Sequence, residues 1–375
     1  MLIAIDGNEA NIEGRVGIGQ FAYEVLSQFA KLKSPDVRFE IYLKRRPVSD
    51  MPRATSGWAY KVFGPRPLWT QLALPYHLYR EKPRPDVFFT PSHYAPRFSP
   101  VPTVVSIMDL SYLFFPEYFK SSDLKQLKSW TAYSVKKAAR VVTISNSTKD
   151  DIIAEYGVLP KNVSVVYSGI KSGISLAPHI YSMEELKAKY GIKDSYILFV
   201  GTLQPRKNIS RLIEAFSYLS EKSRQETDLV IVGKKGWLYE DILAAPRKFG
   251  VPEQVKFLDF VPDDELGELY KHAQCYVLPS LYEGFGLPVL EAMQYGCPVI
   301  TSKVSSLPEA GGDAVLYVDP ENSKDIAEKI EKLLSDNDLR KRLIEKGKLQ
   351  VKKFSWEKTA RETLAVLKSV GEKSS

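Results

Sequence analysis

The chain has 375 residues, of which 44% are hydrophobic and 26% are charged. This length exceeds that of one small domain, and no apolar run approaches the roughly 20 residues that a membrane-spanning helix requires. We therefore expect a soluble, folded protein of two domains. Its net charge of +7 is unevenly distributed, since residues 1–172 hold 23 Lys and Arg against 15 Asp and Glu. This excess of cations favours contact with an anionic partner.

The N-terminal segment from Met1 to Asp6 lacks the basic region and the cleavage site of a signal peptide, and it predicts a buried strand. We therefore expect a cytoplasmic protein. Cys275 and Cys297 are the only cysteines, and each lies among apolar neighbours. We expect both to be reduced and buried.

Apolar strands and amphipathic helices alternate along the first half of the chain, which favours a parallel sheet covered by helices. In chain order we predict a strand at 2–6, a helix at 19–31, strands at 37–43, 86–90 and 103–108, a helix at 121–139 and a strand at 141–145. Residues 168–179 are rich in Gly, Ser and Pro without periodicity, which is typical of a linker. We therefore assign residues 1–172 to a first domain.

A second alternating series follows this linker. We predict strands at 196–200, 228–232, 255–257, 275–279 and 299–301, and helices at 208–219, 263–272, 288–295, 323–334 and 338–354. Residues 173–355 then form a second domain, and the amphipathic segment 356–370 is a candidate to cross back to the first. The predicted fold class is α/β, with two doubly wound, Rossmann-like domains that face a central ligand cleft.

Residues 279–291 (PSLYEGFGLPVLE) join a predicted strand to a predicted helix and carry two carboxylates eight residues apart. Gly284 and Gly286 allow the backbone to approach a ligand closely. The free N–H groups at the start of the helix favour an anion such as a diphosphate. Glu283 and Glu291 are suited to accept hydrogen bonds from sugar hydroxyl groups.

Two further loops follow predicted strands and could meet phosphate groups. In residues 201–208 (GTLQPRKN), Arg206 offers a bidentate fork and Lys207 a point charge, which suits a departing diphosphate. Residues 14–19 (GRVGIG) open a helix after the first strand. A dinucleotide site fits this loop less well, because the strand-to-glycine gap is long and no convincing acidic ribose ligand follows about 20 residues on.

These segments together resemble glycosyltransferase family 4, whose members are retaining enzymes of the GT-B fold. The resemblance includes the E-x7-E pattern within EGFGLPVLEAM, and it extends from GRVGIGQ through GTLQPRKN to SSLPEAGGDA and FSWEKTA. It implies a metal-independent hexosyltransferase without a cofactor, which moves a sugar from a nucleotide sugar to a carbohydrate or lipid-linked acceptor in cell-envelope polysaccharide biosynthesis. Relatives with similar sequences in these motifs are often mannosyltransferases, so GDP-mannose is the first expected donor. A UDP-sugar remains an alternative donor.

The resemblance also implies roles for individual residues. Catalytic roles are expected for Glu283, Arg206, Lys207 and Asp109. Donor contacts are expected for Gly17, Gly19, Gly284, Phe285, Gly286, Leu287, Glu291 and Glu309.

One segment departs from the family pattern. Relatives commonly have His-Asp-Leu after the strand that begins at residue 103, whereas this chain has Met108 before Asp109. A thioether cannot replace an imidazole as a proton donor or base. His93 stands at the carboxyl end of the strand predicted at 86–90, in the segment FFTPSH, so His93 and Met108 are both candidates for the acceptor side. We expect transfer to survive, because a front-face mechanism needs no protein base. The alternative is a catalytically degenerate protein that still binds nucleotide sugars.

Other patterns predict simpler roles. Asp336-Asn-Asp338 fits the D-x-D pattern of a metal site, but it separates two predicted helices and is interpreted as helix caps. The basic first half fits peripheral contact with an anionic membrane at its inner face. Candidate residues for this contact are Lys44, Arg45, Arg46, Lys120, Lys125 and Lys128. No nucleic-acid recognition motif accompanies these charges, so nucleic acid is not an expected partner.

Overall fold

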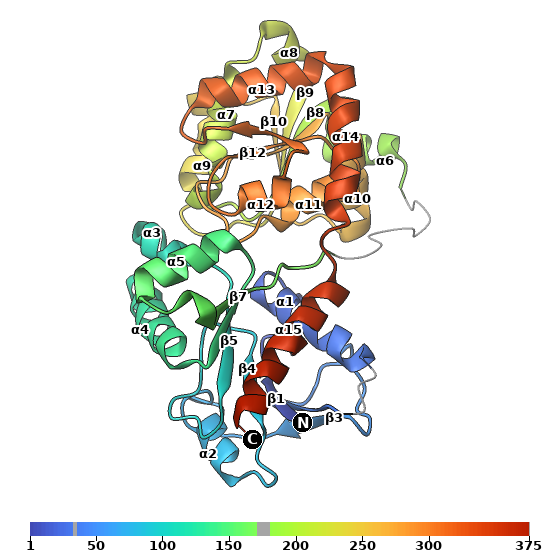
Figure 1. Ribbon diagram of the computed structural model, residues 1–375. Coiled ribbons are helices and arrows are strands. Elements are labelled where there is room, and N and C mark those ends of the chain that lie inside the picture. The colour runs from blue at the N-terminus through green and yellow to red at the C-terminus, as the bar shows by residue number, and fades with distance from the viewer. Residues whose placement is uncertain (33–35, 171–180, 375) are drawn as a thin grey trace. The chain divides into compact units, whose positions relative to one another are not determined.

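A computed structural model of the chain describes residues 1–32, 36–170 and 181–374. The chain forms two compact units, shown in Figure 1. Unit 1 comprises Met1–Gly169 and Ser355–Ser375, and unit 2 comprises Ile170–Phe354. The predicted boundary after residue 172 and most of the predicted linker fall on residues 171–180, outside the described residues. No helix in the described part of the chain is long and apolar enough to cross a membrane.

Unit 1 is built on a parallel sheet, with seven strands in its described residues in the order β3-β2-β1-β4-β5-β6-β7. The strands are β1 (Leu2–Asp6), β2 (Arg38–Leu43), β3 (Trp58–Val62), β4 (Val87–Thr90), β5 (Thr103–Ile107), β6 (Arg140–Thr143) and β7 (Val163–Val165). Every residue of β1, β4 and β5 is buried, because a parallel sheet is covered on both faces.

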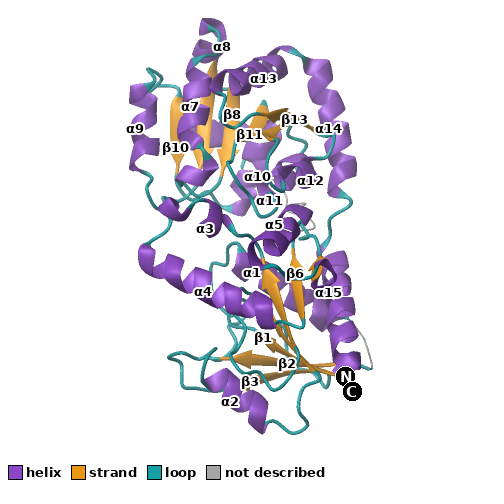
Figure 2. Cartoon of the chain, turned by 60° about the vertical axis from the view of Figure 1, so that its left-hand side comes forward, coloured by secondary structure: helices purple, strands orange, loops and turns teal. Residues whose placement is uncertain are grey.

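Helices cover both faces of this sheet, as Figure 2 shows. The α-helices are α1 (Ile18–Lys31), α2 (Ala73–Arg80), α3 (Ser111–Phe114), α4 (Ser121–Lys137), α5 (Asn146–Tyr156) and α15 (Trp356–Gly371), and the 3₁₀ turns are η1 (Pro116–Tyr118), η2 (Pro160–Asn162) and η4 (Glu372–Ser374).

The helix α15 belongs to unit 1 although it follows unit 2 in the sequence. It packs beside α1 (Figure 1), where the buried ring of Trp356 meets Phe21 edge-on with ring centroids 5.9 Å apart. The hydroxyl of Thr359 donates a hydrogen bond of 2.7 Å to the carbonyl of Tyr167. The backbone at Gly169 runs so close to α15 that a Cβ atom there would lie 2.2 Å from the Trp356 nitrogen.

Replacement of Gly169 by Ala should therefore destabilise unit 1. The added methyl group would overlap backbone atoms that cannot move aside, so we expect the free energy of unfolding to fall by about 3 kcal/mol. Denaturant unfolding would measure this change. Gly57→Ala is the matched control, because the nearest neighbouring atom, the Val37 carbonyl oxygen, would lie 3.9 Å from the new Cβ. Equal stabilities of the two variants would contradict the close contact.

Unit 2 repeats this architecture with a parallel sheet, whose six strands in the described residues have the order β10-β9-β8-β11-β12-β13. The strands are β8 (Ser195–Val200), β9 (Thr227–Val232), β10 (Val255–Leu258), β11 (Cys275–Leu278), β12 (Val299–Ser302) and β13 (Val315–Val318). Cys275 and Cys297 are both free and buried, as predicted.

The helices of unit 2 also lie on both faces of its sheet (Figure 2). They are α6 (Met183–Tyr190), α7 (Ile209–Ser217), α8 (Glu221–Glu226), α9 (Glu240–Lys248), α10 (Asp263–His272), α11 (Leu287–Gln294), α12 (Leu307–Gly311), α13 (Ser323–Ser335) and α14 (Asn337–Val351), with the 3₁₀ turn η3 (Pro205–Lys207). Asp336 caps α14 by accepting a hydrogen bond from the Leu339 nitrogen, which confirms its interpretation as a cap.

The strand order reverses at one point in each sheet. In unit 1, β1 pairs with β2 on one side and with β4 on the other. In unit 2, β8 likewise pairs with β9 and with β11. At such a point the loops after the two central strands diverge, which leaves room for a ligand at the carboxyl edge of the sheet. We therefore expect ligand-binding residues in the loops after β1, β4, β8 and β11.

Candidate functional site

In unit 2 the loops after β8 and β11 are tied together directly. The Leu281 nitrogen donates to the Arg206 carbonyl at 2.9 Å. Asn208 adopts a left-handed conformation with φ 59° at the end of η3. Its side-chain nitrogen donates to the carbonyls of Pro279, at 3.0 Å, and Pro320, at 2.7 Å. These bonds hold the two loops of the switch point in a fixed relation.

The three charged residues predicted here form one ionic cluster. Lys207 Nζ lies 2.6 Å from Glu283 Oε1, and Arg206 Nη1 lies 3.2 Å from Glu283 Oε2. Ser280 donates a further hydrogen bond of 2.6 Å to Glu283 Oε1, and Arg206 Nη1 also donates to the Tyr282 carbonyl. The structure thus brings together residues that are 76 positions apart in the sequence.

This cluster keeps the Glu283 carboxylate charged although Glu283 is only 7% exposed. Burial alone raises the pKa of a carboxyl group, because a buried charge loses its hydration. Here the charges of Lys207 and Arg206, with the hydrogen bonds from Lys207 and Ser280, outweigh that effect and lower the pKa of Glu283 to about 2. Glu283 is therefore an anion at neutral pH, and both cations are oriented by it.

A third loop, which follows β12, holds the backbone of Glu283. The Glu283 nitrogen donates to Ser305 Oγ at 2.9 Å, and Ser306 Oγ donates to the Glu283 carbonyl at 2.7 Å. Ser305 has a φ of 47°, a conformation that is costly for a residue other than glycine. Glu283 is thus fixed by the loops after β8, β11 and β12.

The start of α11 has the backbone geometry expected from its glycines. Gly286 lies at the N-cap with φ 101°, and a Cβ atom there would lie 2.8 Å from a methyl carbon of Leu307. Leu287 is the first helical residue and is partly exposed, whereas Gly284 is buried. The buried ring of Phe285 packs on Phe354 with centroids 5.3 Å apart. The Phe285 side chain therefore belongs to the core of unit 2.

The two remaining glutamates predicted to contact the donor lie on neighbouring helices. Glu291 is partly exposed on α11, and Glu309 is partly exposed on α12. The carbonyl of Glu309 accepts a hydrogen bond of 3.2 Å from Gln350 Nε2, which anchors α12 to α14. Both helices follow strands of the same sheet, so these glutamates and the ionic cluster share unit 2.

In unit 1 the side chain of Arg15 anchors the glycine-rich loop that follows β1. Its guanidinium group makes two hydrogen bonds to Asp50, of 2.5 and 2.8 Å, and lies 4.0 Å from the centre of the Tyr23 ring. Gly17 is the N-cap of α1 with φ 52°. Gly19 is buried, and a Cβ atom there would lie 3.0 Å from the Glu9 carbonyl. Both glycines are therefore required by the path of the backbone.

The loops after β4 and β5 bring His93 and Met108 together. The Met108 nitrogen donates to His93 Nε2 at 3.2 Å, so the neutral ring carries its proton on Nδ1. Burial lowers the pKa of His93, although the charge of Asp109 opposes this effect. His93 Nδ1 is buried and has no hydrogen-bond partner among the described residues. Asp109 Oδ1 accepts hydrogen bonds from the nitrogen and the hydroxyl of Ser111, at 2.9 and 2.7 Å.

Asp6, which ends β1 at the switch point of unit 1, was not among the predicted site residues. Burial raises the pKa of Asp6 to about 6, although hydrogen bonds from Asn8 and the charge of Lys44 act in the opposite direction. The backbone and side-chain nitrogens of Asn8 donate to Asp6 Oδ1 at 3.0 and 2.6 Å. An acid at the carboxyl end of the first strand was the available signal in the sequence.

The raised pKa of Asp6 makes unit 1 less stable when this group ionises. The protonated carboxyl group of Asp6 contributes its full stabilisation below the unfolded pKa of 3.8. This stabilisation is lost as the pH rises through the folded pKa of about 6. We expect Asp6→Asn to remove this loss, so its stability relative to wild type should rise by up to about 3 kcal/mol between about pH 4 and about pH 7.5. Denaturant unfolding across this range would measure the difference, with exposed Asp123→Asn as the control. A difference that is independent of pH would contradict the buried carboxyl group.

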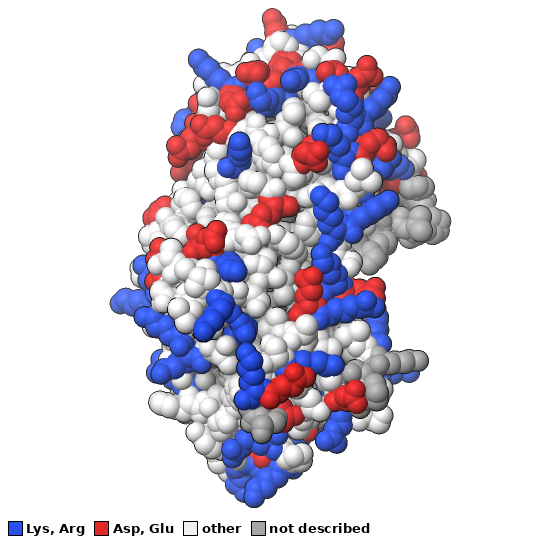
Figure 3. All heavy atoms as spheres, in the orientation of Figure 1, with Lys and Arg blue, Asp and Glu red and all other residues white. Residues whose placement is uncertain are grey.

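All six cations considered for membrane contact are exposed. Lys44, Arg45 and Arg46 follow β2, while Lys120 is the N-cap of α4 and Lys125 and Lys128 lie in its first half. Figure 3 shows basic side chains gathered over α4, with few acidic side chains among them.

Two family models match the chain. Residues 17–172 match the model described as Glycosyltransferase Family 4, and residues 182–350 match the model described as Glycosyl transferases group 1. Between them these two matches include the ionic cluster, His93, Met108 and residues 17–19 of the glycine-rich loop.

Individual proteins are similar as well. O-antigen chain mannosyltransferase B of Escherichia coli is 32% identical over 266 residues, which are 71% of this chain and 70% of that protein. The serotype-specific mannosyltransferase WbdA of Escherichia coli is 35% identical over 229 residues, 60% of this chain and 28% of that protein. The solved structure of HepE from Anabaena, in complex with UDP and glucose, has 17% identity and a TM-score of 0.73, and covers 98% of this chain and 100% of its own.

Proposed function

Because the chain is a glycosyltransferase that belongs to family 4 and has the GT-B fold, we propose that it is a retaining hexosyltransferase with a nucleotide-sugar donor. Its acceptor is a carbohydrate or a lipid-linked sugar. GDP-mannose is the first donor that we propose, supported by the mannosyltransferases among its relatives. A UDP-sugar is the alternative, in line with the UDP complex of HepE.

The ionic cluster of Arg206, Lys207 and Glu283 is the observation that carries this proposal. Two cations lie at the switch point of unit 2, where a parallel sheet binds its ligands. Arg206 can bind a phosphate through two parallel hydrogen bonds, and Lys207 adds a second positive charge. Because Glu283 holds both side chains in place, little orientational entropy remains to be lost when a diphosphate binds.

In the proposed reaction the bond between C1 of the sugar and the diphosphate oxygen breaks, and its electron pair stays on that oxygen. Arg206 and Lys207 stabilise the negative charge that develops there. The acceptor hydroxyl oxygen then bonds to C1 on the same face, and its proton passes to the departing phosphate oxygen. The configuration at C1 is retained, and no protein base is consumed. We propose that the two cations make a divalent metal unnecessary for this step.

For the acceptor we propose a role for the carboxyl edge of unit 1. His93 is neutral, and its buried Nδ1–H group has no partner among the described residues. It sits against the Met108 backbone, so an imidazole lies next to the position where relatives carry histidine. Asp109 is proposed to act through its charge on His93. We also propose that exposed Lys125 and Lys128 on α4 contact an anionic membrane near the acceptor.

Thermal unfolding with a panel of UDP, GDP, ADP, UDP-sugars and GDP-mannose tests the donor site. A ligand that binds only the folded state raises the melting temperature, by roughly 5 °C or more when its concentration is about 100 times Kd. We expect GDP and GDP-mannose to produce this shift. Arg206→Ala and Glu291→Ala should abolish it, whereas exposed Arg247→Ala on α9 should retain it.

The same panel separates the alternatives. A shift with UDP compounds alone would replace GDP-mannose by a UDP-sugar. A nucleotide sugar that raises the melting temperature but is neither hydrolysed nor transferred in a separate turnover assay would support the degenerate binding protein. A shift of equal size in wild type and Arg206→Ala would contradict the assignment of the diphosphate to the ionic cluster.

A further inference from the structure

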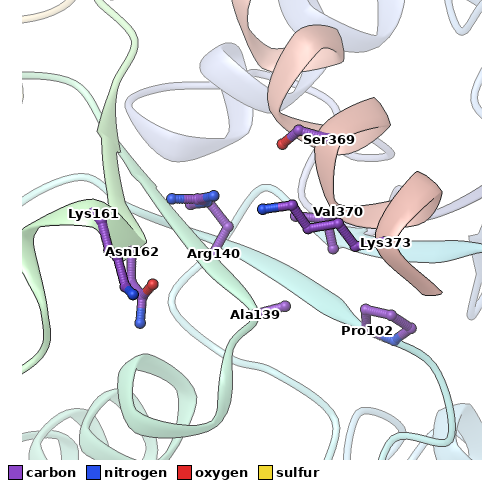
Figure 4. A pocket seen from close by; sticks show the side chains of 8 residues that line it. All are labelled: Pro102, Ala139, Arg140, Lys161, Asn162, Ser369, Val370 and Lys373. Carbon is purple, nitrogen blue, oxygen red and sulfur yellow. The ribbon is translucent and has the colours of Figure 1, made fainter.

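A cationic pocket lies in unit 1 at the amino ends of β5, β6 and β7, the edge of the sheet opposite to the candidate site. Its volume is about 510 Å³. Arg140 begins β6, Asn162 precedes β7, and Ser369 and Lys373 come from the end of α15 and from η4. Figure 4 shows the Lys373 side chain extending toward Arg140, below Ser369. We call this cavity, with Lys161 at its side, the amino-edge pocket.

The charge of the amino-edge pocket is uncompensated. Arg140, Lys161 and Lys373 line it, and none of its eight described lining residues is acidic. Within the described residues these three cations form no ion pair, in contrast to Lys207 and Arg206. Three like charges around one cavity repel each other, so an anion that enters lowers the energy of all three. Asn162 adds a side-chain amide group that can donate hydrogen bonds, whereas the Ser369 hydroxyl already donates to the Val366 carbonyl at 2.8 Å.

A second cavity adjoins this pocket and has a different character. Its volume is about 350 Å³, and it shares Pro102 and Ala139 with the amino-edge pocket. Its lining is mostly apolar and includes Val101, Tyr133 and Phe98, with Lys137 as its one charged residue. Phe98 is 77% exposed, so its ring offers apolar surface beside this cavity. A cationic cavity and an apolar cavity therefore share one wall.

We propose that these two cavities bind a phosphate-bearing lipid. The phosphate group binds Arg140, Lys161 and Lys373, and the first part of an acyl or isoprenoid chain lies against Phe98 and Tyr133. Arginine and lysine are the residues that bind phosphate most effectively, and apolar surface left in water favours a hydrocarbon chain. A soluble phosphate would use the first cavity only.

This inference does not depend on the proposed sugar transfer. The candidate residues of unit 1 follow the carboxyl ends of β1, β4 and β5, whereas the amino-edge pocket lies before β5, β6 and β7. The two places are separated by the length of a strand, roughly 15 Å. A lipid here would hold unit 1 on a membrane without occupying the candidate site.

Binding of dihexanoyl phosphatidic acid to the full chain, measured by calorimetry, tests the proposal. Glycerol 3-phosphate supplies the phosphate without chains, and dihexanoyl phosphatidylcholine supplies the chains without net negative charge. We expect phosphatidic acid to bind at least tenfold more tightly than either. The exposed pair Lys161→Gln/Lys373→Gln should weaken its binding at least tenfold, while Lys222→Gln/Lys324→Gln removes the same charge from exposed positions of unit 2 and should not.

Each other outcome overturns part of this inference. Equal affinities of wild type and the Lys161→Gln/Lys373→Gln variant would remove the amino-edge pocket as the binding site. An equal loss in the unit 2 control would assign the effect to net charge, again against the pocket. Equal affinities for glycerol 3-phosphate and phosphatidic acid would overturn the lipid and leave a soluble phosphate as the ligand.

Discussion

The buried carboxylate of Glu283 is the constraint on which the candidate site of unit 2 depends. A charge removed from water is stable only when partners replace its hydration, and here Lys207, Arg206 and Ser280 do so. Removal of one member would leave the others buried and uncompensated, at a cost of about 3 to 5 kcal/mol. The loops after β8, β11 and β12 are therefore held in one arrangement by electrostatics as much as by the sheet.

This constraint has a functional consequence for the two cations. Without Glu283, the side chains of Arg206 and Lys207 would repel each other and move apart. With it, they stay together at the switch point, and their combined charge of +2 exceeds the single negative charge of the carboxylate. The cluster retains a net positive charge, which fits an incoming diphosphate. The left-handed conformations of Asn208 and Ser305 place strain in these same loops, as is common at ligand-binding sites.

The sequence could predict the parallel, two-unit fold, because long alternating elements carry a clear pattern. The bounds of β1 and α10 were predicted as observed. The elements β3, α9 and β13 were not identified, because β3 and β13 are partly exposed edge strands and α9 carries Pro246 within the helix. The sequence motifs identified Arg206, Lys207 and Glu283 as site residues. They could not show that these residues pair, because Lys207 and Glu283 are 76 positions apart in the sequence. The core position of the Phe285 ring and the contact between His93 and Met108 are likewise tertiary features.

A double-mutant cycle tests most directly whether Glu283 orders the cations for a diphosphate. Calorimetry would give the Kd for GDP of wild type, Lys207→Met, Glu283→Gln and the double variant, with melting curves to establish that each is folded. If Lys207 and Glu283 act on GDP as a pair, the double variant should lose less binding free energy than the sum of the two single losses. The difference should be about 1 kcal/mol or more. Losses that add within about 0.3 kcal/mol would show that the two residues act independently, and would contradict this account.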